Sequence, residues 1–196
     1  MKEEKKEGRF DKLFIIIIVI LGIFGFYWVA TQPAPNKSVD KKTEGITENF
    51  NKVSGALGIG DMAYDFSTED SFGSKITLSE FRNKRPVLLV FWATWCGYCA
   101  KELPDMKEFV QKYQDRIQVI IIASGEEEKT VKEYIQEKDI NFRIFLDKNR
   151  KIWSQYAVRG TPSHFLINIE GEINYLRPGL ASKTDLEIMM TMVPKI

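Results

Sequence analysis

Residues 86–99 read PVLLVFWATWCGYC and hold both cysteines of the chain, Cys96 and Cys99. The run at 86–92 is short and rich in branched and aromatic side chains, which is typical of a buried strand. Beyond the cysteines, apolar residues recur at helical spacing: Leu103, Met106, Phe109, Val110 and Tyr113. The sequence therefore predicts a strand followed by a helix, with Cys96 at the helix N-terminus.

This position of the CxxC motif suits thiol chemistry. The unpaired N–H groups and the positive dipole end of a helix favour a thiolate, the form of cysteine that attacks disulfides. Cys99 follows one helical turn later, so the two sulfurs can bridge without a change in the backbone. A bridge that encloses so short a loop contributes little stability. We therefore predict a redox-active Cys96–Cys99 disulfide rather than a structural one.

Zinc binding is the other common use of paired cysteines. Two thiolates supply half of a tetrahedral ligand set, and the single histidine, His164, does not complete it. The sequence predicts no metal and no other cofactor.

His164 heads an apolar strand, so we expect it to pack in the sheet or at its rim rather than to act in catalysis. Residues 126–128, three glutamates before a predicted helix, are expected to complement the helix dipole.

The N-terminal part of the chain predicts a membrane anchor. Residues 13–30 read LFIIIIVILGIFGFYWVA, an uncharged run long enough to span a bilayer as a helix. Basic residues are denser in 1–12 than after the run, which predicts a cytoplasmic tail and an extracytoplasmic remainder. A cleaved signal peptide is the alternative, although Trp28, two positions before Ala30, does not fit a small-residue cleavage site.

The rest of the chain divides into a linker and one domain. Residues 31–60 are rich in Pro, Lys, Ser, Thr and Gly, as in a tether, and residues 61–196 are enough for one compact domain. The formal net charge is +1 with both signs interspersed, which gives no electrostatic reason to expect nucleic acid as a partner.

Strands and helices alternate along this domain, which is typical of an α/β fold. We expect a leading hairpin (63–68 and 75–77), a short helix through 78–82, and the strand 86–92. After the active-site helix, the patterns predict further strands at 118–123, 143–146, 164–169 and 172–176. They predict further helices at 129–138, 149–156 and 184–193.

The run FWATWCGYCAKELPDM at 91–106, with Thr161-Pro162 ahead of a strand, resembles the thioredoxin superfamily. Specifically, it resembles the membrane-anchored TlpA/ResA-like thiol-disulfide oxidoreductases, because Trp92, Trp95, Pro104 and Pro162 are in register with the CxxC motif. The resemblance implies a thioredoxin-like α/β fold with an N-terminal β-hairpin and an inserted helix and strand, preceded by one transmembrane helix.

The resemblance also implies roles for individual residues. Cys96 attacks a substrate disulfide and Cys99 resolves the mixed disulfide. The Thr161-Pro162 bond is cis and places a backbone edge beside the sulfurs, where an extended substrate can add a strand. Trp95, Thr161 and Pro162 are thus the predicted substrate-binding residues.

Glu102 matches the position of a carboxylate that the ResA branch uses near its thiols, so we predict it to be catalytic. Gly97-Tyr98 departs from the Glu-Pro dipeptide common in that branch and resembles the active site of a disulfide isomerase. The resemblance therefore implies thiol-disulfide exchange, and the dipeptide leaves both a reductase and an oxidase or isomerase as interpretations.

The sequence as a whole favours an extracytoplasmic protein-disulfide oxidoreductase that reduces disulfides in exported proteins such as apo-cytochrome c. A membrane thiol donor of the CcdA/DsbD kind would restore its dithiol. The alternatives are a disulfide oxidase or isomerase, a non-catalytic thioredoxin-fold adaptor and a thiol peroxidase. An adaptor would need neither cysteine, and the WCGYC context is not that of a peroxide-binding loop.

Overall fold

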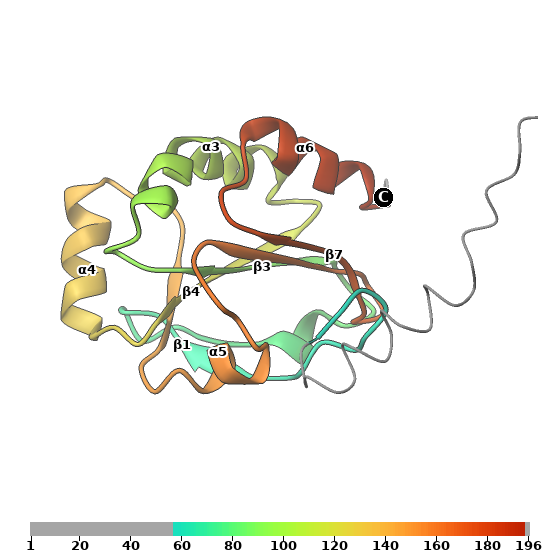
Figure 1. Ribbon diagram of the computed structural model, residues 1–196, viewed down its shortest axis with the longest axis horizontal. Coiled ribbons are helices and arrows are strands. Elements are labelled where there is room, and N and C mark those ends of the chain that lie inside the picture. Colours follow the sequence, from blue (N-terminus) through green and yellow to red (C-terminus); the bar gives the residue numbers. More distant parts are fainter. Residues whose placement is uncertain (1–56, 195–196) are drawn as a thin grey trace, which may run out of the picture. The chain divides into compact units, whose positions relative to one another are not determined.

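The computed structural model describes residues 57–194. They form a five-stranded mixed sheet of order β5-β4-β3-β6-β7 and a separate two-stranded hairpin, β1-β2 (Figure 1). The strands are β1 (Ser67–Glu69), β2 (Lys75–Thr77), β3 (Val87–Trp92), β4 (Gln118–Ser124), β5 (Ile144–Asp147), β6 (Ser163–Ile167) and β7 (Ile173–Pro178). The helices are η1 (Leu78–Phe81), α3 (Gly97–Tyr113), α4 (Glu128–Glu137), α5 (Lys151–Gln155) and α6 (Lys183–Thr191). The predicted α/β order is confirmed.

The predicted central strand, β3, lies in the middle of the sheet. It pairs parallel with β4 and antiparallel with β6, and all of its residues are buried. Because successive strand residues point to opposite faces, Leu88 and Val90 join the core under α3, α4 and α6. Leu89 and Phe91 join the core on the other face, with α5 and the β1-β2 hairpin. Burial on both faces explains the unbroken apolar run of β3.

The predicted first strand of the hairpin, 63–68, is wrong in extent. The Ala63 N–H donates to the Gly171 carbonyl at 2.9 Å, and Met62 forms a bridge with Glu172. At the start of this segment, the chain therefore pairs beside the β6-β7 turn and not with β2. β1 forms only from its end, where it pairs antiparallel with β2.

The predicted tail (1–12), anchor (13–30) and most of the linker (31–60) lie outside the described residues. Within 57–194, no helix is long and apolar enough to cross a membrane.

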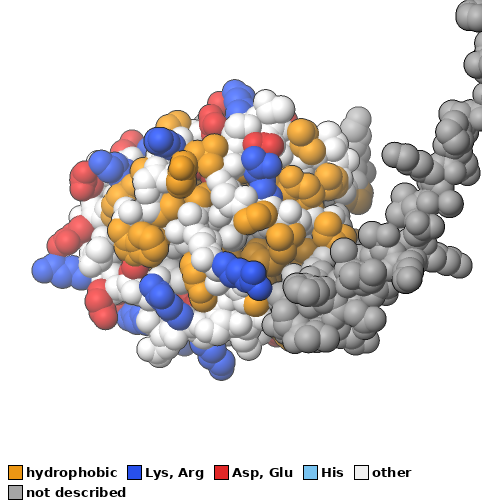
Figure 2. All heavy atoms as spheres, viewed as in Figure 1, with side chains coloured by type: hydrophobic (Ala, Val, Ile, Leu, Met, Phe, Trp, Pro, Cys, Tyr) orange, Lys and Arg blue, Asp and Glu red, His pale blue; other side chains and the backbone are white. Residues whose placement is uncertain are grey.

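The surface of the described domain carries charges of both signs. On the face shown in Figure 2, lysine and arginine side chains lie among aspartate and glutamate side chains, with hydrophobic side chains between them. This mixture agrees with the small net charge and gives this face no strong field of one sign.

Candidate active site

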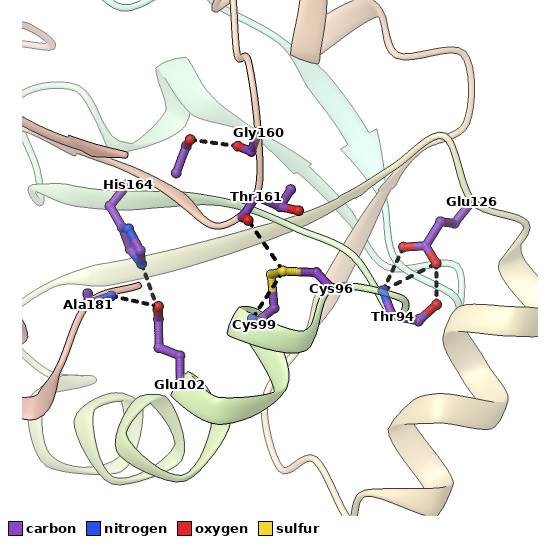
Figure 3. Close-up of a disulfide and its surroundings, with 10 residues drawn as sticks. Thr94, Cys96, Cys99, Glu102, Glu126, Gly160, Thr161, His164 and Ala181 are labelled. Atoms are coloured by element: carbon purple, nitrogen blue, oxygen red, sulfur yellow. Dashed lines mark hydrogen bonds and ion pairs between the residues drawn. A yellow bond between two sulfur atoms is a disulfide. The ribbon is translucent and has the colours of Figure 1, made fainter. Parts of the chain in front are cut away.

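Cys96 and Cys99 form a disulfide at the N-terminus of α3 (Figure 3), with their Cα atoms 5.2 Å apart. Cys96 is the N-cap of α3, and its Sγ accepts a hydrogen bond from the Cys99 N–H at 3.0 Å. The predicted strand-to-helix position and the predicted bridge are both confirmed. After reduction, the same N–H and the helix dipole favour negative charge on the Cys96 sulfur.

The two cysteines are both buried, and Cys99 is the more completely buried of the two. Cys96 is 6% exposed and Cys99 is 1% exposed, whereas the flanking Trp95 and Tyr98 are 66% and 63% exposed. An incoming substrate therefore meets two exposed aromatic rings and the Cys96 side of the disulfide first. This order agrees with the predicted roles, in which Cys96 attacks and Cys99 resolves, and those roles remain predictions.

The loop before β6 lies against the disulfide. The Thr161-Pro162 peptide bond is cis, as the resemblance implied, and the Thr161 carbonyl oxygen lies 3.4 Å from the Cys96 Sγ. The Pro162 carbonyl accepts a hydrogen bond from the Gly179 N–H at 2.8 Å, which ties the loop to the end of β7. A backbone edge is thus fixed beside the sulfur, the arrangement that strand addition by a substrate requires.

Glu102 lies one helical turn after Cys99 and is buried, with 4% exposure. One carboxylate oxygen, Oε1, lies 2.6 Å from the His164 Nε2, and the other, Oε2, accepts a hydrogen bond from the Ala181 N–H at 2.9 Å. Figure 3 shows the carboxylate pointing from α3 toward β6 rather than along the helix. The carboxylate predicted to act near the thiols is therefore enclosed in protein.

His164 is fully buried in β6. It lies opposite Val90 of β3 and Arg177 of β7, and its Nδ1 is 3.3 Å from the Arg177 carbonyl oxygen. The expectation that it packs in the sheet is confirmed, but sequence reasoning missed its contact with Glu102. A lone polar residue in an apolar strand signals that a buried partner exists, while the partner's identity depends on the fold.

Sequence reasoning also missed Glu126, the other buried glutamate beside the disulfide. Its two carboxylate oxygens lie 3.2 and 3.0 Å from the Thr94 nitrogen, and the Thr94 hydroxyl also donates to it. The expectation that it complements a helix dipole is wrong, since its carboxylate anchors the loop that leads into Cys96 (Figure 3). Glu127 and Glu128 do occupy the N-cap and first turn of α4.

Comparisons with known proteins agree with this geometry. The AhpC/TSA family model matches residues 59–176. A thiol-disulfide oxidoreductase ResA of Bacillus cereus is 36% identical over 183 residues, which cover 93% of this chain and 95% of that protein. The thioredoxin-like protein YneN of Bacillus subtilis (strain 168) is 30% identical over 176 residues, 88% of this chain and 92% of that protein.

Solved structures give the same result for the fold. The pneumococcal exposed lipoprotein thioredoxin of Streptococcus pneumoniae strain TIGR4 superposes with a TM-score of 0.60 at 28% identity, over 66% of this chain and 100% of that one. The thioredoxin-like fold expected from the resemblance is confirmed.

Taken together, the disulfide on the helix N-terminus, the adjoining cis-proline loop and these likenesses define an enzyme of the thiol-disulfide oxidoreductase class. Such an enzyme acts on disulfide-containing protein substrates. More narrowly, the chain belongs to the AhpC/TSA family and is of the ResA type.

Proposed function

We propose that this protein is a membrane-anchored, extracytoplasmic reductant that opens disulfides in exported proteins, apo-cytochrome c among them. The observation that carries the chemistry is the Cys96 sulfur, which caps α3 and accepts the Cys99 N–H beside the Thr161 carbonyl. The location rests on the uncharged run 13–30 and its flanking charges. The substrate class rests on the ResA-type likeness.

The reaction is two successive thiol-disulfide exchanges. In the reduced enzyme, the Cys96 thiolate attacks one sulfur of the substrate disulfide, which forms a mixed disulfide and releases the other substrate sulfur as a thiolate. Cys99 loses its proton and attacks the Cys96 sulfur, which releases the second substrate thiolate. The substrate gains two electrons and two protons as two thiols, and the enzyme is left with the Cys96–Cys99 disulfide.

A second exchange partner must return the two electrons. We propose a membrane thiol donor of the CcdA/DsbD kind, whose thiolate attacks the Cys96–Cys99 disulfide in the same way and regenerates the dithiol. The exposed rings of Trp95 and Tyr98 border the sulfur that both partners must reach.

The direction of electron flow depends on how strongly the reduced form is stabilised. A strong oxidant stabilises its attacking thiolate with cations or several hydrogen-bond donors, and neither Gly97 nor Tyr98 supplies a cation. We therefore expect a reduction potential nearer the roughly −270 mV of thioredoxin than the roughly −120 mV of a strong oxidant. Equilibration of the full-length protein with dithiothreitol or glutathione buffers measures it, and a potential above about −180 mV would favour the oxidase or isomerase alternative.

The substrates are identified by trapping. In cells that carry the Cys99→Ser variant, the Cys96 sulfur forms mixed disulfides that no second thiol resolves, and the captured proteins can be identified by mass spectrometry. A Cys96→Ser, Cys99→Ser double variant is the matched control for non-specific association. Capture of exported cysteine-containing proteins supports the proposal, and capture of cytoplasmic proteins alone contradicts it.

The location is tested separately from the chemistry. Cells are stripped of their wall and treated with a reductant, so that the Cys96–Cys99 disulfide is open. A membrane-impermeant thiol reagent should then label Cys96, and the protein should sediment with membranes. Protection of both cysteines from the reagent would place the domain on the other side. Recovery as a shortened, non-sedimenting form would instead identify a cleaved signal peptide.

A further inference from the structure

The hydrogen-bond partners of His164 indicate where its protons lie. The Nδ1 is 3.3 Å from the Arg177 carbonyl oxygen, and a carbonyl only accepts, so the contact is a hydrogen bond when Nδ1 carries the proton. In that tautomer a neutral imidazole has a lone pair on Nε2. This lone pair faces the Glu102 Oε1 at 2.6 Å, a distance that requires a proton between the two atoms.

The contact of the second carboxylate oxygen, Oε2, excludes it as the atom that carries this proton. The Glu102 Oε2 accepts the Ala181 N–H at 2.9 Å, so it is the unprotonated oxygen. The shared proton therefore lies between Oε1 and Nε2. Whether it sits on the oxygen or on the nitrogen, the Glu102–His164 pair then has no net charge. Loss of the proton would leave two lone pairs facing each other in a site that excludes water.

Other charged groups around the pair are already matched. From β7, the Arg177 guanidinium donates to the Leu180 carbonyl at 3.2 and 3.0 Å and lies 2.9 Å from the Asp185 carboxylate of α6. From β3, the residue opposite His164 is the apolar Val90. From α3, the neighbours on the same helical face as Glu102 include Cys99. Because Cys99 lies one turn from Glu102 on α3, the charge of the pair bears on the thiols.

We propose that His164 is a positioning residue of the exchange reaction: it keeps a proton on the Glu102–His164 pair and so removes the negative charge that Glu102 alone would place beside the thiols. This inference rests on the dithiol chemistry proposed above and adds a proton site to it. An unpaired carboxylate disfavours a nearby thiolate, whereas a pair without net charge does not.

The pair can also take part in the resolving step. During the first attack the pair gives its shared proton to the departing substrate sulfur, and the Cys99 thiol then returns a proton to the pair and becomes a thiolate. That thiolate attacks the Cys96 sulfur, and the substrate sulfur leaves as a thiolate. The pair has by then returned to zero net charge, and the second substrate sulfur takes its proton from solvent to become a thiol.

Nuclear magnetic resonance of the wild-type protein tests the proton assignment directly. Because the chain has a single histidine, ¹⁵N-histidine labelling of the full-length protein in detergent gives the signals of one ring. We expect Nδ1 to be protonated at neutral pH, with Nε2 either protonated or a hydrogen-bond acceptor. A neutral ring with its proton on Nε2 alone would overturn the proposal. This measurement does not depend on substrate or activity.

The role of the proton is tested by His164→Gln. A glutamine amide can still donate a hydrogen bond to Glu102, but it cannot hold an additional proton. We expect the ultraviolet titration of the thiolate to move to higher pH, with about tenfold less thiolate relative to thiol at a given pH below the transition. Glu102→Gln already removes the charge, so adding His164→Gln in that background should give no further shift.

A matched control is the same substitution in a Glu126→Gln background, where the shift should persist, because Glu126 contacts Thr94 and not His164. An equal shift with and without Glu102, or no shift at all, would make His164 a packing residue. Circular dichroism and the unfolding midpoint verify that the variants fold. If a variant does not fold, the ¹⁵N-histidine spectrum of the wild-type protein still tests where the protons of His164 lie. Wild-type exchange with oxidised glutathione separates the outcomes, since its absence would refute the dithiol chemistry and not the proton assignment.

Discussion

Two buried glutamates lie on opposite sides of the disulfide, and they differ in their partners (Figure 3). Glu126 accepts from the backbone N–H and the hydroxyl of Thr94, groups that keep their protons at any physiological pH. The Glu102 Oε1 lies 2.6 Å from the His164 Nε2, a ring nitrogen that can carry either a proton or a lone pair. The same residue type therefore serves as a fixed anchor on one side and as part of a proton site on the other, because the donors differ.

The largest effect should come from the sulfurs that lie between these two glutamates. Cys96→Ser should reduce exchange with a protein disulfide to the uncatalysed rate, since the attacking thiolate is lost. Cys99→Ser should retain the first attack and accumulate mixed disulfides. Stopped-flow reduction and mass spectrometry measure both. Faster alkylation of Cys99 than of Cys96 in the reduced protein would reverse this assignment.

On the Glu102 side, substitution should affect the chemistry more than the fold. In Glu102→Gln, the amide oxygen can still accept from Ala181 and the amide nitrogen can donate to His164, so the free energy of unfolding should change little. The substrate-reduction rate should fall by about 10²-fold, a typical contribution of a proton-transfer group. The test is the pH profile of reduction beside a urea titration. An unchanged rate would make Glu102 a structural residue, whereas the thiolate titration should change little, because the Glu102–His164 pair already has no net charge.

On the Glu126 side, substitution should affect the fold more than the chemistry. Glu126→Gln puts an amide N–H₂ group where a carboxylate oxygen accepts the Thr94 N–H, so donors face each other. Hydrogen bonds to buried charged groups contribute roughly 1.5–3 kcal/mol, and we expect a loss of about that size in a urea titration. Glu126→Gln could instead slow the exchange of the folded protein as much as Glu102→Gln does. That result would contradict the assignment of a structural role to Glu126 and of a proton-site role to Glu102.

A smaller effect should come from the exposed ring between Thr94 and Cys96. Trp95 is 66% exposed, so Trp95→Ala should leave stability nearly unchanged. If the ring contacts protein substrates, KM for a protein disulfide should rise by about fivefold, as for an interface side chain that contributes roughly 1 kcal/mol. The rate with oxidised glutathione, which is too small to need the ring, is the control. A matching loss with both substrates would indicate damage to Cys96 instead.

The smallest effect should come from Asp185, which helps to place the Ala181 N–H that binds Glu102. Hydrogen bonds from Ser182 lower the pKa of Asp185, and α6 begins with a capping box of these two residues. A lowered folded-state pKa stabilises the fold above the aspartate's ordinary value and loses that effect as the pH falls through the folded value. Asp185→Asn should therefore cost about 1 kcal/mol near pH 7, and the difference from wild type should shrink below about pH 4.

Urea titrations at several pH values measure this difference. A loss that stays constant down to acid pH would mean that the charge of Asp185 does not contribute.

Most of the fold could be predicted because its signals are local. The apolar run of β3, the helical spacing after Cys99 and the cysteine spacing predict the strand, the helix and the disulfide without any long-range information. The error in the first strand has a different origin. An extended pattern predicts that a segment pairs but not with which neighbour, and Ala63 pairs beside Gly171 rather than with β2.

The same reasoning explains what was missed in the site. Glu102 was predicted only from its family position, and its burial depends on where β6 and α6 lie. His164 and Glu126 each bind a residue that is distant in sequence, Glu102 and Thr94 respectively. A buried polar group can be suspected from its apolar surroundings, but its partner is defined by sheet order and helix docking.

The Glu102 contacts also have a consequence for the order of folding. The sulfurs that bond are three residues apart, whereas Glu102 meets partners 62 and 79 residues further along the chain. Local contacts close faster than distant ones, and during synthesis the N-terminal part of a domain emerges first. The cysteines can therefore meet and be oxidised while β6 and α6 are still absent. A newly made chain then has its redox pair before it has the residues that tune that pair, and only the completed domain has the proton site.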